Sequence, residues 1–197
     1  LAQIPRQTRH QSLGIQEQLE AGIRCLDVGC RLQGGVLRVF EDGVDQATDL
    51  ASVVDAAGTF LKGQPSEAVL LILREDTAST GDFGAALEQE IARNPSLWIL
   101  GTEIPSLGGV GSATGARGRI VLVRRFKATP PGRGIDATTW AQGFRGTFRS
   151  GPFRVSDAPE LEGFAQEDVD SRWALVQGAI NQARFEQALA SLTLCNG

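Results

Sequence analysis

The sequence predicts an α/β fold in which helices alternate with the strands of a parallel sheet, either open or closed into a barrel. Two observations support this prediction. Residues Ala68–Leu73 (AVLLIL) and Ile120–Val123 (IVLV) are uninterrupted apolar runs, which are typical of strands covered on both faces. Segments with apolar residues at helical spacing separate the predicted strands. Because no internal repeat or low-complexity linker interrupts the chain, we expect one domain over residues 1–197.

The N-terminal part predicts a short helix followed by two strands. Ser12–Gly22 has a Ser start, long-chain and acidic residues, and a Gly end, as short helices do. Arg24–Leu32 alternates with period two, so it predicts a strand. A glycine-rich turn leads to a second strand at Val36–Phe40, which Asp42-Gly43 closes. The first strand places Leu26, Val28, Cys30 and Leu32 on one face and Cys25, Asp27, Gly29 and Arg31 on the other.

The rest of the chain continues the alternation. Helical spacing predicts helices at Leu50–Leu61, which Gly63-Gln64-Pro65 ends, and at Phe83–Ala92. The segment Gly108–Gly118 is a glycine-rich loop without the Lys-Ser/Thr pair of a phosphate-binding loop. Beyond the two apolar runs we expect a strand at Phe153–Val155 and a long helix between Val169 and Ile180, before Leu192–Cys195.

Composition excludes several function classes. The chain has 19 Lys plus Arg against 23 Asp plus Glu, a formal charge of -4, and no basic run that follows a phosphate backbone, so nucleic acid is not an expected partner. It has one His (His10), no Tyr and no Met. A pair of histidines for acid and base catalysis is therefore impossible, and we expect neither a metal site nor a cofactor.

Location and thiol chemistry stay open at this stage. No stretch approaches the roughly 20 apolar residues of a membrane helix, so we expect no transmembrane segment. The start at Leu1 without Met fits a processed, secreted chain, and a cytoplasmic location is the alternative. Cys25, Cys30 and Cys195 form no CxxC motif, and Cys25 and Cys30 fall on opposite faces of the predicted strand, so they are not expected to pair.

Polar side chains stand at the ends of five predicted strands, where parallel α/β folds gather functional groups. Arginines bind oxyanions with two hydrogen bonds, and aspartates hold hydroxyl groups, so the combination suits an anionic, polar ligand. The alternative is a set of ordinary salt bridges among solvated loop ends. The strand ends are Asp27 and Arg31, Glu41 and Asp42, Arg74 to Asp76, Arg124 and Arg125, and Asp157.

Three separated segments resemble the X-type catalytic domain of phosphatidylinositol-specific phospholipase C, especially its compact bacterial and fungal forms. They are QSLGIQEQLEAGIRCLDVGCRL, GQPSEAVLLILRED and ARGRIVLVRRF, in the order of that family, and they cover about residues 11–126. The resemblance implies a distorted or incomplete TIM-type barrel. It also implies pocket roles for Arg74 and Arg125, and for Asp157 as a residue that binds hydroxyls.

The resemblance implies a catalytic set that this chain lacks. The family cleaves a phosphodiester by attack of an inositol hydroxyl, with one His as base, a second as acid and an Arg on the phosphate. Gly29 stands where that Arg is expected, and Asp42 stands where the second His is expected. His10 matches the first His only across a long deletion.

Three functions follow, and whether the chain is an enzyme is left open. We favour a barrel that has lost diester cleavage and binds a small polar or lipid-derived ligand, or performs isomerisation, cyclisation or elimination on it. The first alternative is a phosphodiesterase with rewired residues, and the second is a binding protein without catalysis. Candidate acid and base residues are Asp42, Asp27, Glu75 and His10, and candidate ligand-binding residues are Arg74, Arg125, Asp157, Arg31 and Arg38.

In the phosphodiesterase alternative, His10 is the base, Asp42 is the acid, and Arg31 or Arg38 reaches the phosphate. For each of these functions that involves a ligand, we expect an interior cavity lined by Asp27, Asp42, Arg74, Arg125 and Asp157. No partner protein is indicated by the sequence.

Overall fold

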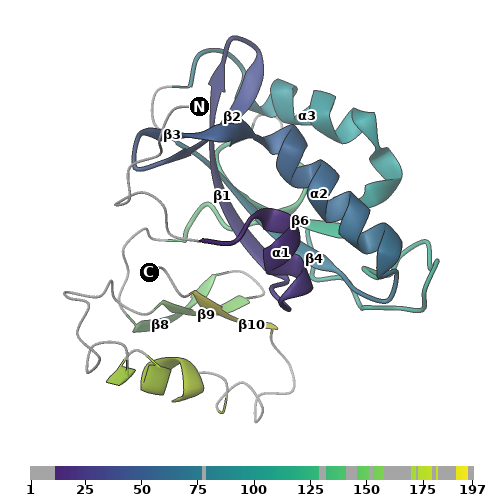
Figure 1. Cartoon of the computed structure of the whole chain (residues 1–197), viewed down its shortest axis with the longest axis vertical. Coiled ribbons are helices and arrows are strands. Elements are labelled where there is room, and N and C mark those ends of the chain that lie inside the picture. Colours follow the sequence, from purple (N-terminus) through teal and green to yellow (C-terminus); the bar gives the residue numbers. More distant parts are fainter. Residues whose placement is uncertain are drawn as a thin grey trace. The chain divides into compact units, whose positions relative to one another are not determined.

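The computed structural model describes residues 12–76, 79–128, 132–140, 146–150, 153–157, 170–171, 173–178, 181 and 190–194. The chain forms two compact units, Leu1–Thr138 and Thr139–Gly197. Figure 1 shows the ribbon with its helices and strands labelled. The first unit carries a seven-stranded sheet and the second carries a three-stranded sheet.

The large sheet is mixed, with a parallel centre. Strand β1 (Cys25–Gln33) pairs in parallel with β4 (Val69–Glu75), which pairs in parallel with β6 (Ile120–Arg125). Two short strands, β5 (Trp98–Ile99) and β7 (Ile135–Asp136), also pair in parallel with β6.

On the other side of β1, the strands β2 (Val36–Glu41) and β3 (Val44–Asp49) form an antiparallel extension. The order along the sheet is β3-β2-β1-β4-β6-β5, with β7 on β6. No pairing among the described residues joins β3 to β5, so the sheet is open. The expectation of an α/β fold with a distorted or incomplete barrel is thereby confirmed.

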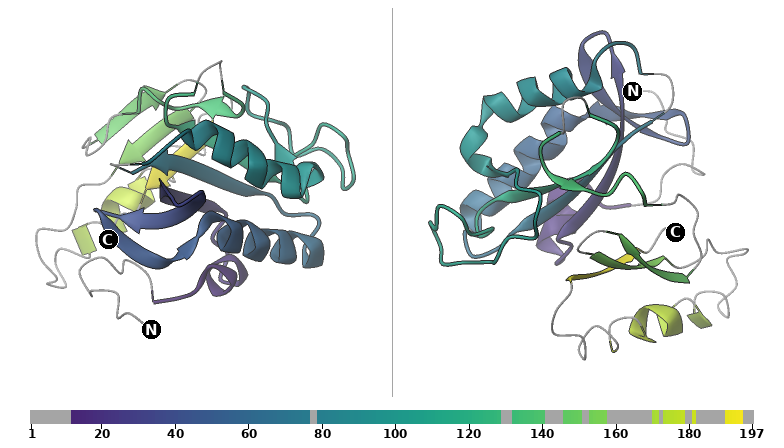
Figure 2. Two further views of the ribbon diagram at one scale, coloured as in Figure 1. Left: turned by 90° about the horizontal axis from the view of Figure 1, so that it is seen from above. Right: turned by 180° about the vertical axis from the view of Figure 1, so that it is seen from behind.

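Helices cover one face of this sheet. The helices α2 (Leu50–Gly63) and α3 (Phe83–Arg93) lie side by side in Figure 1, and Figure 2 shows them from two further directions. Their apolar residues share one buried cluster with the odd-numbered strand residues Leu71 and Leu73 and with one face of β1. That face carries Leu26, Val28, Cys30 and Leu32, which the predicted alternation places together, and all four are buried.

The opposite face of the parallel strands therefore carries Asp27, Gly29 and Arg31, as expected from the alternation. Two residues before Arg74 and Arg125 on their strands this face is apolar, since Ile72 and Val123 are fully buried there. Cys25 and Cys30 are both free thiols on opposite faces of β1, and burial raises the pKa of each to about 12. A thiol with such a pKa is almost entirely protonated near neutral pH, so neither cysteine suits nucleophilic chemistry.

Local interactions set the helix boundaries. Helix α1 (Ile15–Glu20) starts later than Ser12, because the Glu17 carboxylate accepts a hydrogen bond from the backbone N–H of Gly14 at 2.7 Å. Helix α2 starts at Leu50, because the Asp49 carboxylate accepts bonds from the backbone N–H of Ser52 at 2.8 Å and its hydroxyl at 2.7 Å.

Strand β3 is an element that the sequence does not predict. Asp42 and Gly43 have φ angles of 47° and 79°, so they form the two-residue turn that folds β3 back onto β2. The β3 sequence, VDQATD, lacks a clean apolar alternation, and only its pairing with β2 holds it extended.

The second unit is a small sheet in the order β10-β9-β8. Strand β9 (Phe153–Asp157) lies antiparallel to β8 (Gly146–Ser150) and parallel to β10 (Ala190–Leu194). The predicted strand at Phe153–Val155 is confirmed, and β8 and β10 are additions. Residues 170–171 and 173–178 are helical, within the predicted long helix. No helix in the described part of the chain has the length and hydropathy needed to cross a membrane.

Replacing Asp49 with Ala is expected to lower the free energy of unfolding by about 1 kcal/mol at pH 7, because α2 loses its N-terminal cap. Hydrogen bonds from Ser52 lower the pKa of Asp49 below its usual value. This stabilisation is therefore present above the unfolded-state pKa and is lost as the pH falls through the lower, folded-state pKa. Urea denaturation at pH 7 and in strong acid measures both values.

Asp49→Asn is the matched control, because an amide oxygen also caps a helix. It should keep most of the stability at pH 7 and should not reproduce the acid dependence. An Asp49→Ala variant as stable as the parent chain at pH 7 would refute this account of the start of α2.

Candidate functional site

Three parallel strands bring one row of residues to the carboxyl end of the sheet. Gly29 of β1 lies opposite Arg74 of β4, and Arg74 lies opposite Arg125 of β6. Residues opposite one another in a sheet share a face, so both arginines lie on the face that carries Asp27. Asp27 is one step earlier on that face of β1, where it pairs with Ile72.

The Asp27 carboxylate joins the two arginines. Its Oδ1 lies 3.5 Å from Nε of Arg74, and its Oδ2 lies 3.5 Å from Nη1 of Arg125. The Arg74 guanidinium also forms a close ion pair with Glu41 at the end of β2. We call Asp27, Glu41, Arg74 and Arg125 the carboxylate–arginine cluster. It contains two carboxylates and two guanidinium groups, so its formal charges balance.

The side chains of the cluster are largely withdrawn from water, although Asp27 as a whole residue is exposed. The exposed fractions of the side chains are 11% for Arg125, 18% for Arg74 and 23% for Asp27. Burial raises the pKa of Asp27, and the nearby Arg74 and Arg125 act in the opposite direction without reversing the shift. Asp27 is therefore a carboxylate that accepts a proton more readily than an ordinary one.

Gly29 makes room for the Arg74 guanidinium. A Cβ at position 29 would lie 3.0 Å from Cζ and Nη1 of Arg74 and 2.6 Å from the carbonyl oxygen of Phe40. A contact of 2.6 Å does not occur and one of 3.0 Å is rare, so any larger residue here displaces the β2 backbone and crowds the guanidinium. The glycine that stands in place of the expected arginine is thus matched by an arginine from the neighbouring strand.

A third arginine continues the row beyond Gly29. The Arg31 guanidinium lies 4.0 Å from the centre of the Phe40 ring, and its Nη2 is 3.7 Å from Oδ2 of Asp76. The stacking on Phe40 fixes the plane of the guanidinium. The loop after β4 passes the end of β1 here, because the N–H of Asp76 donates to the carbonyl oxygen of Cys30 at 2.7 Å.

Several predicted site residues lie elsewhere. Asp42 is exposed at the tip of the β2–β3 turn, so it does not line an interior, contrary to the predicted cavity. Its positive φ turns it away from the alternation of β2 that predicted an inward position. Glu75 is exposed and pairs with Cys30, which places it on the helix-covered face. Arg38 is bound by Asp45 within the β2–β3 hairpin at 3.1 Å.

The positions of two further candidate side chains lie outside the description. His10 lies outside the described residues. Asp157 is the last residue of β9 and belongs to the second unit, and its side chain is likewise outside the description. Both therefore remain predictions. No group of His, Cys, Asp and Glu among the residues described has the arrangement of a metal site.

Sequence reasoning named Glu41 only as one of the polar strand ends, and it included neither Glu41 nor Phe40 among the candidate site residues. Glu41 stands next to Asp42 at the predicted strand end, so its position was visible, but its contact with Arg74 depends on the turn. Phe40 reads as an ordinary core residue in the sequence, and it is indeed buried. Only the pairing of β1 with β2 places its ring under Arg31.

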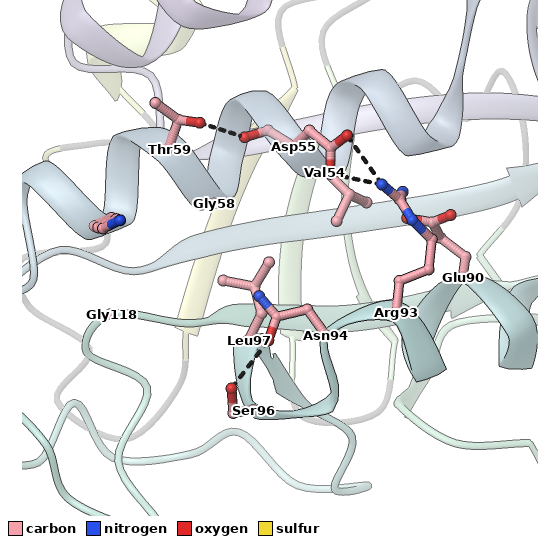
Figure 3. Close-up of a pocket in the computed structure, with 11 residues that line it drawn as sticks. Val54, Asp55, Gly58, Thr59, Glu90, Arg93, Asn94, Ser96, Leu97 and Gly118 are labelled. Atoms are coloured by element: carbon pink, nitrogen blue, oxygen red, sulfur yellow. Dashed lines mark hydrogen bonds and ion pairs between the residues drawn. The ribbon is translucent and has the colours of Figure 1, made fainter.

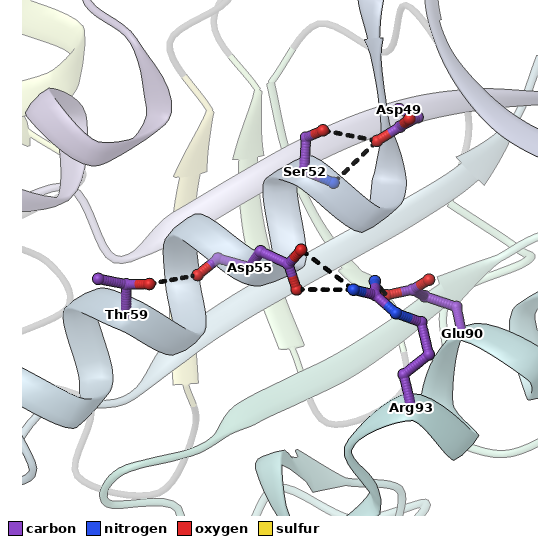
Figure 4. A network of polar contacts seen from close by, with 6 residues as sticks. All are labelled: Asp49, Ser52, Asp55, Thr59, Glu90 and Arg93. Carbon is purple, nitrogen blue, oxygen red and sulfur yellow. Dashed lines mark hydrogen bonds and ion pairs between the residues drawn. The ribbon is translucent and has the colours of Figure 1, made fainter.

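A groove of about 590 Å³ lies between α2 and α3, on the side of the sheet that the helices cover. Figure 3 shows its lining residues, and Figure 4 shows the contacts of Arg93 with Asp55 and Glu90, together with the Asp49 cap. Arg93 and Asp55 are 46% and 63% exposed. Ion pairs this exposed contribute little, so the groove is a solvated surface network and not a second buried polar cluster.

Similar proteins are found by comparison of structures and not by comparison of sequences. No protein-family model matches the chain, and no curated protein matches it by sequence. A solved structure of a pentafluoro-Phe variant of phosphatidylinositol-specific phospholipase C from Staphylococcus aureus matches with a TM-score of 0.68 and 18% identity, over 94% of this chain and 63% of that one. The fold is that of a bacterial phosphatidylinositol-specific phospholipase C.

The enzyme of the same name from Listeria monocytogenes gives a consistent result. It matches with a TM-score of 0.60 and 18% identity, over 94% of this chain and 62% of its own. The chain thus spans less than two thirds of the length of these phospholipases. The resemblance seen in the three sequence segments is confirmed in the arrangement of the chain.

Replacing Gly29 with Ala is expected to lower the free energy of unfolding by about 1–3 kcal/mol, because the added methyl group overpacks the contact of β1 with Phe40 and Arg74. Urea denaturation measures the loss. Gly63→Ala is the matched control, since a Cβ at the end of α2 meets no atom within 4 Å. Equal stability of the two variants would show that Gly29 is not needed for close packing.

Proposed function

We propose that this phospholipase-C-like scaffold binds a phosphorylated polyol, with the phosphate on Arg74 and Arg125 and a hydroxyl group on Asp27. One observation carries the proposal: two largely buried arginines at the carboxyl ends of β4 and β6 share a single carboxylate, that of Asp27 on β1. Ligands of barrels with parallel strands bind at this end. The structural neighbours are named for phosphatidylinositol, whose headgroup is a phosphorylated polyol.

The chemistry of the cluster suits this ligand. Guanidinium groups bind oxyanions with paired hydrogen bonds, and low exposure strengthens these bonds. In the free protein, Asp27 and Glu41 neutralise the arginines, so no unpaired charge is buried. A ligand phosphate replaces part of this pairing, and the hydroxyl groups of a polyol then supply donors to the carboxylates.

Loss of the usual diester cleavage is part of the proposal. Gly29 provides no phosphate arginine from β1, and Asp42 lies in solvent at a turn. Each lost donor or acid/base group is worth roughly 10²- to 10⁴-fold in rate. Asp27, with its raised pKa, is the residue that we assign to any remaining proton transfer, such as isomerisation, cyclisation or elimination of the bound polyol.

Isothermal titration with myo-inositol 1-phosphate tests the binding site. Arg74→Gln and Arg125→Gln are each expected to weaken binding by about tenfold or more, the usual loss for a hydrogen bond to a charged group. Arg93→Gln, on the helix-covered side, is the control and should bind like the parent chain. Unchanged affinity in both cluster variants, or an equal loss in Arg93→Gln, would refute the assignment.

An assay on phosphatidylinositol vesicles separates the proposal from its main alternative, an active phosphodiesterase. We expect no release of cyclic inositol phosphate by the parent chain, with or without divalent metal. Asp42→Asn and His10→Asn are made in parallel. Turnover that either substitution abolishes would establish a rewired phospholipase and would overturn the proposed loss of cleavage.

A further inference from the structure

Arg31 is a cation of this face that lies outside the carboxylate–arginine cluster. Its Nε is buried and has no hydrogen-bond partner in the structure. The neighbouring groups explain why. Phe40 offers only the face of its ring, and Asp76 Oδ2, at 3.7 Å from Nη2, forms an ion pair with Arg31 but is beyond hydrogen-bond distance.

A buried charged donor without an acceptor is costly, so its retention needs a reason. The Arg31 side chain is 20% exposed, so part of it reaches solvent although its Nε is buried, and its stacking on Phe40 holds it in place. Arg38, directly opposite on β2, shows the contrast, because its guanidinium is already bound by both carboxylate oxygens of Asp45.

The position of Arg31 relates it to the carboxylate–arginine cluster. It is two residues beyond Gly29 on the same face of β1, and Gly29 is opposite Arg74. Two residues of a strand span roughly 7 Å. A second cationic centre therefore lies one such step from the row of Arg74 and Arg125, further toward the carboxyl end of the strands.

We propose that Arg31 binds a second anionic group of the ligand, so that the site prefers a polyol with two phosphates to one with a single phosphate. This inference rests on the proposed function, because it takes the first phosphate to lie on Arg74 and Arg125. Phe40 orients the Arg31 guanidinium, and the second phosphate binds this guanidinium in place of its loose ion pair with Asp76.

The test compares the affinities for myo-inositol 1-phosphate and myo-inositol 1,4-bisphosphate by isothermal titration. The parent chain is expected to prefer the bisphosphate by about tenfold, the effect of one charge-assisted hydrogen bond. Arg31→Gln should reduce this preference to less than about threefold while leaving the affinity for the monophosphate unchanged. Arg38→Gln removes the same charge from the neighbouring strand and should keep the preference.

A second measurement does not depend on the folding of any variant. In ¹⁵N spectra of the parent chain, the Nε–H resonance of Arg31 should move on addition of the bisphosphate and stay in place with the monophosphate. An unmoved resonance, or a preference that persists in Arg31→Gln or disappears in Arg38→Gln, overturns the inference. If the monophosphate binds without any preference, only the role of Arg31 fails, whereas absence of binding by both ligands refutes the proposed function as well.

Discussion

The candidate site depends on one shared interaction, the contact of the Asp27 carboxylate with both Arg74 and Arg125. Two like charges are brought together on neighbouring strands, and without a carboxylate between them they would repel one another at low exposure. Gly29 is the steric counterpart of this arrangement, because the space of its missing side chain is where the Arg74 guanidinium lies. Charge balance and the absence of a Cβ thus place the arginines together.

This arrangement differs from the one that the sequence resemblance implies, although the scaffold is the same. The phosphate arginine expected on β1 is absent, and a guanidinium from β4 lies beside the position that it would occupy. The expected acid position, Asp42, lies at an exposed turn, while the preceding residue, Glu41, reaches Arg74. These two differences, an arginine supplied by β4 and a carboxylate supplied by Glu41, are consistent with a polar, charge-balanced ligand site on a phospholipase-like scaffold.

Much of this could be predicted from sequence, and the failures have local causes. The apolar runs at Ala68–Leu73 and Ile120–Val123 predict the buried parallel strands, because burial on both faces leaves a continuous pattern. Strand β3 was not predictable, since its polar residues are extended only through pairing with β2. The inward position assigned to Asp42 was wrong, because strand alternation ends where a residue adopts positive φ. The partners of Asp27 required the register of three strands, which one sequence does not contain.

The most direct test of the central claim is a crystal structure of the protein with myo-inositol 1-phosphate bound. We predict phosphate oxygens within hydrogen-bond distance of the guanidinium groups of both Arg74 and Arg125, with a ring hydroxyl donating to Asp27. A ligand bound in the groove between α2 and α3, or bound elsewhere while the contacts of Asp27 with both arginines stay intact, would contradict the account.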